Sequence, residues 1–136
     1  EKWRSEIREL TQVSDIVFGN EEEVMALYDT NIFSDAISAA KNEINLCIIT
    51  RGEKGSIIVS PEGVEEIPAH TCDTVVDTTG AGDLYAAGFL YGLKNSLRLY
   101  ECAQLGSFCA SQVISLLGPR PSSDLAKLAK EEGLLV

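Results

Sequence analysis

Apolar and polar residues follow two patterns along the chain, one with helical spacing and one of short apolar runs. Trp3, Ile7 and Leu10 recur at helical spacing among charged residues, which predicts an amphipathic helix that ends near Thr11. The same kind of spacing predicts five further helices, over residues 21–28, 32–41, 83–94, about 96–117 and 124–130.

Short apolar runs between these helices predict strands. Residues 46–50 are apolar on both sides, as expected for a strand in a sheet that helices cover on both faces. The glycine-rich residues 51–55 lead directly into the next run, so we expect a hairpin-like turn between two strands. The other runs, of which the last two are mixed in polarity, are residues 15–18, 56–60, 64–68 and 71–76.

Length and composition favour one domain over residues 1–136, with an α/β layer structure. The chain has 136 residues, 45% of them hydrophobic, which is enough for a core of its own, and it contains no internal repeat or linker. Its 21 acidic and 11 basic residues give a formal net charge of -10, which argues against nucleic acid as a partner. No apolar run approaches the roughly 20 residues that cross a bilayer, so we also expect no membrane partner.

The cysteines and the histidine argue against a zinc site and for reduced thiols. The four cysteines form no C-x-x-C motif, and His70 is the only histidine. Cys102 and Cys109 share one helix face but lie about 10 Å apart along it, beyond the reach of a disulfide. Reduced thiols favour a cytoplasmic location. Because the chain starts at Glu1 and its only methionine is Met25, we expect it to be part of a longer protein.

Residues 75–83 carry the strongest chemical signal, a strand followed by a loop of small residues and then a helix. The N–H groups of Gly80, Ala81 and Gly82 can approach a ligand closely and lie at the positive end of the following helix, which suits an anion. Asp83 would lie beside that anion and could accept a proton from an attacking hydroxyl group. A plain helix-entry loop with an acid in the first turn explains the same residues and stays open.

Two common phosphate-binding motifs are absent, and a third pattern takes their place. The chain has no G-x-x-x-x-G-K-[ST], and its G-x-G is not completed to G-x-G-x-x-G because position 85 is a tyrosine. Residues 77–90, DTTGAGDLYAAGFL, resemble the second signature of the ribokinase-like (PfkB) carbohydrate kinases. The resemblance implies the C-terminal part of a three-layer αβα sandwich with a mostly parallel central sheet. It also implies that Asp83 is the catalytic base and that Gly80, Ala81 and Gly82 form the anion hole.

Asn20 and Glu23 match the N-x-x-E motif of this family, which there organises Mg²⁺ and its waters near the phosphates. The same two residues fit a helix cap, with Asn20 as N-cap and Glu23 as its partner three residues later. The cap and the magnesium role are both open, and they are compatible.

Thr50, Gly52 and Gly55 resemble the family's T-x-G-x-x-G loop, which contacts the nucleotide. Arg51 or Lys54 would offset phosphate charge there. Without the resemblance, this loop would be an ordinary turn between strands.

Residues 118–122 resemble a loop that in many relatives joins two earlier residues around a monovalent cation. The resemblance implies a K⁺ or Na⁺ site formed by Asp77, Thr79, Gly118 and Ser122. A helix stop made by glycine and proline explains the same residues and is the simpler interpretation.

Taken together, the resemblance implies a kinase that uses ATP and Mg²⁺, with K⁺ as a further cofactor, to phosphorylate a hydroxymethyl group of a sugar or nucleoside. It looks most similar to bacterial sugar kinase and adenosine kinase members, and a homodimer is an expectation. Residues 1–136 correspond to the second half of such a kinase, so the acceptor-binding half is absent and we expect the isolated chain to be inactive. The alternative is a non-catalytic nucleotide-binding or structural fragment.

Overall fold

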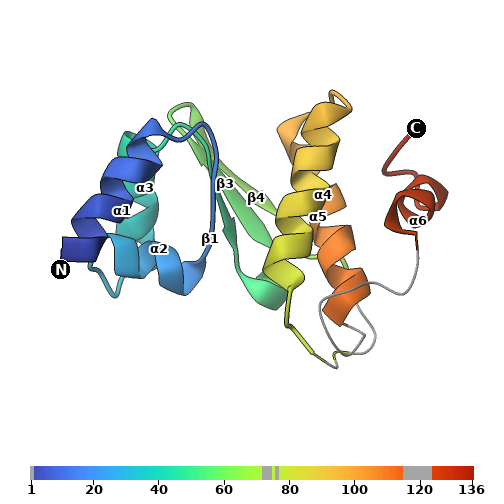
Figure 1. Cartoon of the computed structure of the whole chain (residues 1–136), viewed down its shortest axis with the longest axis horizontal. Coiled ribbons are helices and arrows are strands. Elements are labelled where there is room, and N and C mark those ends of the chain that lie inside the picture. Colours follow the sequence, from blue (N-terminus) through green and yellow to red (C-terminus); the bar gives the residue numbers. More distant parts are fainter. Residues whose placement is uncertain (1, 72–74, 76, 115–123) are drawn as a thin grey trace. The chain divides into compact units, whose positions relative to one another are not determined.

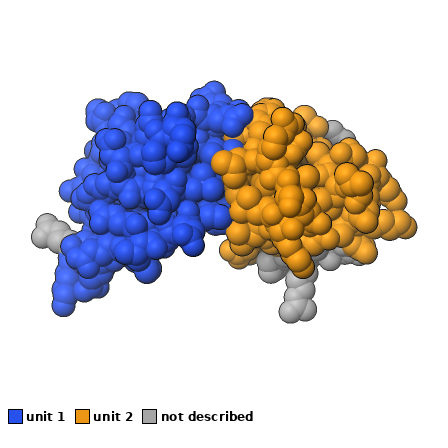
Figure 2. Space-filling model, turned by 90° about the horizontal axis from the view of Figure 1, so that it is seen from above, with its two compact units in different colours: residues 1–52, 56–66 blue, residues 53–55, 67–136 orange. Residues whose placement is uncertain are grey.

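The computed structural model describes residues 2–71, 75, 77–114 and 124–136. The chain forms two compact units (Figure 2), one made of residues 1–52 and 56–66 and the other of residues 53–55 and 67–136. The single domain expected over residues 1–136 stays a prediction. Within the described part of the chain, no helix combines the length and the apolar character needed to cross a bilayer.

The first unit combines three helices with a mixed sheet (Figure 1). Its helices are α1 (Lys2–Val13), α2 (Glu21–Leu27) and α3 (Phe33–Glu43). The sheet has the order β1-β2-β3-β4, with β1 (Val17–Asn20), β2 (Cys47–Thr50), β3 (Ser56–Ser60) and β4 (Gly63–Ile67).

The directions of the strands follow from the lengths of their connections. β1 and β2 are parallel, and α2 and α3 supply the long crossover that parallel neighbours need. β2 and β3 are antiparallel, as the predicted hairpin-like turn requires, and the short 3₁₀ helix Gly52–Lys54 joins them. The alternation of helices and strands agrees with the predicted α/β class.

The core of the first unit lies between α2, α3 and the sheet. Val24 and Leu27 of α2 and Ala36 and Ala40 of α3 pack against one face of β2 and β3. Cys47, Ile48 and Ile49 are all fully buried, so the prediction that β2 is buried on both faces is confirmed.

Helix α1 packs through its polar side and exposes its apolar side. Thr11 is buried, and the Nε atom of Arg4 donates a hydrogen bond of 2.9 Å to the carbonyl of Ala26 in α2. Arg8 pairs with Glu43 at the end of α3. The apolar residues Trp3, Ile7, Leu10 and Val13 are exposed. The predicted helix is confirmed, but polar contacts hold it in this unit.

The second unit consists mainly of α4 (Ala81–Lys94), α5 (Leu99–Ile114) and α6 (Leu125–Glu131). A Cβ atom added to Gly88 of α4 would lie 2.9 Å from the Cys109 sulfur, and one added to Gly106 of α5 would lie 2.8 Å from the Tyr85 carbonyl. The two helices therefore touch through glycine. Asp124 caps α6 through the N–H groups of residues 126 and 127.

Some sequence predictions need adjustment or lie outside the described residues. Helix α4 begins at Ala81, two residues earlier than its apolar pattern suggests, because its first turn consists of small and acidic residues. Most of the strand predicted over residues 71–76 is not described. Cys47, Cys102 and Cys109 are buried free thiols, and Cys72 lies outside the described residues.

Candidate active site

The loop before α4 ends in a glycine N-cap, which has no side chain to cap the helix. Gly80 is the N-cap residue of α4 and has φ 80° and ψ 0°, the left-handed region that favours glycine. No side chain of a described residue caps the helix there. Asp83 is the third residue of α4 and is exposed, and no described side chain pairs with it. The carboxylate is thus accessible from solvent at the positive end of the helix.

The three amides assigned to the anion hole differ in their partners. The N–H of Ala81 donates to the carbonyl of Thr78 at 3.1 Å, so it already has an acceptor in this structure. Among the described residues, no backbone carbonyl accepts a hydrogen bond from the N–H of Gly80 or Gly82. No heavy atom lies within 4 Å of a Cβ atom built on Gly82. An anion could therefore accept hydrogen bonds from the N–H groups of Gly80 and Gly82 more readily than from that of Ala81.

Asp77 and Thr79 lie together just before this loop. The Oδ1 atom of Asp77 accepts hydrogen bonds from the N–H of Thr79 at 2.9 Å and from its hydroxyl at 2.7 Å. The N–H of Asp77 donates to the carbonyl of Ile114 at the end of α5. The other two residues assigned to a monovalent cation, Gly118 and Ser122, lie outside the described residues. The cation site stays a prediction.

The N-x-x-E motif forms the predicted helix cap. The N–H of Glu23 donates to the side-chain oxygen of Asn20, and the N–H of Asn20 donates to Oε2 of Glu23, both at 2.8 Å. This capping box begins α2 at the exit of β1. It uses Oε2 of the exposed Glu23 side chain, and Oε1 has no described hydrogen-bond partner.

The T-x-G-x-x-G loop contains two glycines with positive φ. Gly55 has φ 90°, and a Cβ atom there would lie 2.0 Å from the Ile67 carbonyl, so packing alone requires glycine. Gly52 has φ 59° and nothing within 4 Å of a Cβ atom, which leaves its backbone open. The hydroxyl of Thr50 donates to the Gly19 carbonyl at 3.5 Å. The turn explanation accounts for both glycines, and nucleotide contact stays a prediction.

Arg51 is engaged within the first unit. Its Nε atom donates to Oε2 of Glu21 at 2.9 Å, and its guanidinium lies 4.7 Å from the centre of the Phe33 ring. Neither Glu21 nor Phe33 was among the candidate site residues predicted from the sequence. The three consecutive acids of residues 21–23 carry no signal that distinguishes Glu21 from its neighbours.

The predicted residues fall into two groups, one in each unit, except that Gly55 of the T-x-G-x-x-G loop is assigned to the second unit. In the first unit, Asn20 is the register partner of Thr50 at the carboxyl ends of the parallel strands β1 and β2. Ligands in α/β proteins commonly bind at such strand ends. In the second unit, the loop formed by Asp77, Thr79 and Gly80 leads directly to Asp83.

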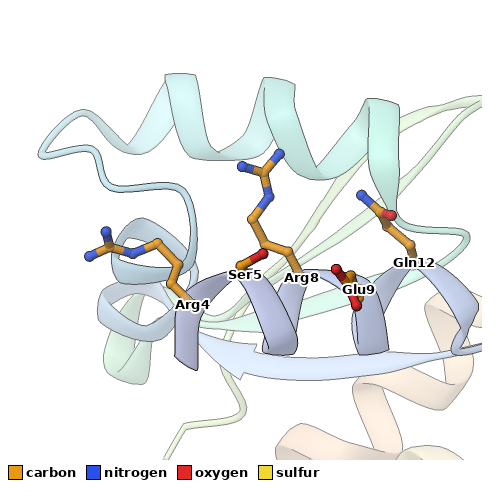
Figure 3. Close-up of a pocket in the computed structure, with 5 residues that line it drawn as sticks. All are labelled: Arg4, Ser5, Arg8, Glu9 and Gln12. Carbon is orange, nitrogen blue, oxygen red and sulfur yellow. The ribbon is translucent and has the colours of Figure 1, made fainter. Parts of the chain in front are cut away.

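A hollow of about 310 Å³ lies on α1, and none of the residues that line it is a predicted site residue. Figure 3 shows Arg8 and Gln12 pointing from α1 toward α3, and both donate hydrogen bonds to Glu43. Arg4, at the other end of the hollow, pairs with Asp29 at 3.2 Å. Because both arginines already have acidic partners, the hollow offers no unpaired cation.

The described residues fit magnesium held through water rather than by a cage of side chains. Within residues 2–71, 75, 77–114 and 124–136, no group of three acidic, histidine or cysteine side chains could hold a metal ion. Mg²⁺ commonly keeps several waters and uses one or two carboxylates together with substrate phosphates. The open oxygen of Glu23 suits that mode of binding.

Comparisons with known proteins agree with the fold and the motifs. The model of the pfkB family carbohydrate kinases matches residues 1–126. The cytidine kinase of Thermococcus kodakarensis is 36% identical over 120 residues, which cover 86% of this chain and 43% of that protein.

Solved structures give the same result. A probable sugar kinase from Rhizobium etli has a TM-score of 0.94 and 38% identity, over 98% of this chain and 41% of that one. The adenosine kinase of Sinorhizobium meliloti has a TM-score of 0.92 and 42% identity, over 96% of this chain and 41% of that one. The chain therefore spans less than half the length of these relatives.

The ribokinase-like α/β fold predicted from the sequence is thus confirmed for this part of the fold. A family match over residues 1–126, together with these structural neighbours, leads to one conclusion: the chain belongs to the pfkB family of carbohydrate kinases.

Proposed function

We propose that this chain is the nucleotide-binding and catalytic part of a cytoplasmic kinase that transfers the γ-phosphoryl group of ATP to a hydroxymethyl group of a sugar or nucleoside. The observation that carries the proposal is the start of α4. There the exposed carboxylate of Asp83 follows the amides of Gly80 and Gly82, which have no described backbone acceptor. Phosphoryl transfer needs a proton acceptor for the attacking hydroxyl group and fixed donors for the charge on the phosphoryl oxygens.

Each group of residues has a role in this proposal. Asp83 takes the proton of the acceptor hydroxyl group, and Gly80 and Gly82 donate hydrogen bonds to the phosphoryl oxygens, with Ala81 joining them only if its bond to Thr78 opens. Thr50 and Gly52 lie at the exit of β2 and contact the nucleotide. Asn20 and Glu23 hold the waters of Mg²⁺, which when bound neutralises phosphate charge.

A monovalent cation such as K⁺, near Asp77 and Thr79, belongs to the same proposal. The Oδ1 atom of Asp77 accepts two hydrogen bonds from Thr79, which fixes the loop that leads to Gly80. A cation held beside this loop would keep the Gly80 amide aimed at the phosphoryl group. Gly118 and Ser122 are its other proposed ligands.

The length of the chain bears on whether residues 1–136 can act alone. The chain spans 41% of the two bacterial kinases of solved structure. These two neighbours are a probable sugar kinase and an adenosine kinase, which supports a sugar or nucleoside as the acceptor. We infer that residues 1–136 alone lack the acceptor pocket, so the isolated chain acts at most as a nucleotide-binding fragment and does not turn over.

The experiment is a pair of matched substitutions in the longer kinase that contains this chain. Asp83→Asn removes the proposed base and should lower kcat by roughly 10²- to 10⁴-fold, with little change in the affinity for ATP. Turnover would be measured by ADP release with adenosine, ribose, fructose and related alcohols as acceptors, and ATP affinity by calorimetry.

Asp35→Asn is the control. Asp35 is also the third residue of a helix, α3, and is also exposed, so the substitution makes the same change in charge at the same helix position. It should leave kcat within about twofold, as surface substitutions usually do. Equal kcat values for Asp83→Asn and the unmodified kinase would contradict the assignment of the base, and no turnover with any alcohol acceptor would contradict the proposed reaction.

A further inference from the structure

The ion pair between Glu21 and Arg51 joins the two motifs at the ends of β1 and β2. Glu21 directly follows Asn20 and begins α2, and Arg51 directly follows Thr50. Asn20 and Thr50 are register partners in the parallel pair of strands. The ion pair therefore ties the first turn of α2 to the loop after β2, one residue beyond the last paired position.

Contacts with both partners hold the Arg51 guanidinium in one place. Its Nε atom lies 2.9 Å from Oε2 of Glu21, and only 20% of the Arg51 side chain and 28% of the Glu21 side chain are exposed. The guanidinium also lies over the ring of Phe33, the first residue of α3, at 4.7 Å. Arginine can bind a carboxylate and stack on an aromatic ring at the same time, because its charged group is planar.

This geometry assigns Arg51 a different task from the phosphate contact that the sequence suggested. A guanidinium that is paired with a carboxylate and stacked on a ring would have to give up both contacts to reach a phosphate. Replacing those contacts costs free energy, since a half-buried carboxylate would be left without its partner. Glu21 would then add negative charge beside the bound nucleotide.

We propose that Glu21 and Arg51, seated on Phe33, are positioning residues for the nucleotide site. The pair holds Thr50 and Gly52 of the nucleotide loop in fixed register with the capping box that orients Glu23. This inference rests on the proposed function, because it assumes that the loop after β2 contacts ATP. Neither side chain touches the nucleotide, and each acts by fixing the backbone of its neighbours.

The test is a double-mutant cycle on ATP binding in the longer kinase. Glu21→Gln and Arg51→Gln should each raise the KM for ATP and the Kd of ATP by about three- to tenfold, and the double variant should do no worse than either single one. The KM for the acceptor and kcat should stay within about twofold. Calorimetry gives the Kd without turnover.

Two further variants separate positioning from a general loss of stability. Glu22→Gln makes the same change in charge one residue further on, at an exposed position, and should leave the KM for ATP unchanged. Arg51→Lys keeps the charge but loses the planar group, so its affinity for ATP should lie between that of Arg51→Gln and that of the unmodified kinase. The melting temperature of each variant without ATP shows whether unfolding explains the change.

Three results would overturn the inference. If Glu21→Gln tightens ATP binding while Arg51→Gln weakens it, Arg51 contacts phosphate directly. If the two single effects add in the double variant, the residues act separately, and if ATP binding does not change, they position nothing. The proposed function fails on a different result, the absence of any turnover in the unmodified kinase, and calorimetry would still test the ion pair in that case.

Discussion

Cys47 illustrates how burial affects a single ionisable group in this chain. It lies in β2 with no exposed surface, and burial raises the pKa of its thiol from 9.0 to about 12. Burial also raises the pKa of Cys109 to about 11, and burial together with the nearby Glu43 raises that of Tyr28 to about 12. All three groups are therefore neutral in the folded chain at pH 9, and each resists ionisation more than in the unfolded chain.

A raised pKa of an acid means that the folded state holds its proton more tightly than the unfolded state does. The free energy of unfolding should thus be fully retained below about pH 9 and should fall as the pH rises from 9 toward 12. Cys47→Val, which fits a buried strand, should reduce this slope by at most about 1.4 kcal/mol per pH unit. Urea unfolding between pH 7 and 10.5 measures how the free energy of unfolding changes with pH. An unchanged slope in the variant would show that Cys47 does not contribute to this pH dependence.

At the level of elements, the contact between α4 and α5 depends on glycine. Gly106→Ala would place a Cβ atom 2.8 Å from the Tyr85 carbonyl, which is backbone and cannot move aside easily. We expect a loss of about 1–3 kcal/mol in the free energy of unfolding, as for other overpacked sites. Because α4 carries Asp83 in its first turn, kcat of the longer kinase should also fall.

Gly63→Ala provides the comparison for that substitution. A Cβ atom on Gly63 has no heavy atom within 4 Å, and its φ is not positive, so the free energy of unfolding should change by less than about 0.5 kcal/mol. Thermal and urea unfolding of both variants measure the difference. Equal stabilities would mean that the two helices can separate enough to admit a methyl group.

Helix α1 gives a second prediction at this level, because its leucine lies on the side away from the core. Leu10 is 64% exposed, whereas Leu27 of α2 is 7% exposed. In the chain of residues 1–136, Leu27→Ala should cost about 2–4 kcal/mol of the free energy of unfolding, and Leu10→Ala less than about 0.5 kcal/mol. A large loss from Leu10→Ala would show that the apolar side of α1 is covered in solution.

At the scale of the whole molecule, the sequence predicted the elements better than their contacts. The spacing of apolar residues located all six helices of the described part of the chain. In each of them except α1, the apolar side packs against a neighbour. Polar contacts of Arg4 and Arg8 hold α1, and ion pairs between residues distant in sequence leave no periodic signal. For the same reason the link between Glu21 and Arg51 could not be predicted.

In the candidate site too, features set by nearby residues could be predicted from the sequence, and features set by the backbone path could not. Local motifs predicted the cap formed by Asn20 and Glu23 and the glycine loop before Asp83, because both depend on residues a few positions apart. The bond from Ala81 to Thr78 depends on the backbone path of the loop, which side-chain types do not specify. The roles of these residues in catalysis stay predictions.

The in-register pairing of β1 with β2 restricts how this chain can vary in length. Asn20 lies opposite Thr50, and successive side chains of a strand point to opposite faces. Inserting or deleting one residue inside either strand would turn the following side chains to the wrong face and move the two motifs out of alignment. An insertion in the turn between β3 and β4 leaves that alignment intact, so this turn is the better place to attach a tag or a reporter sequence.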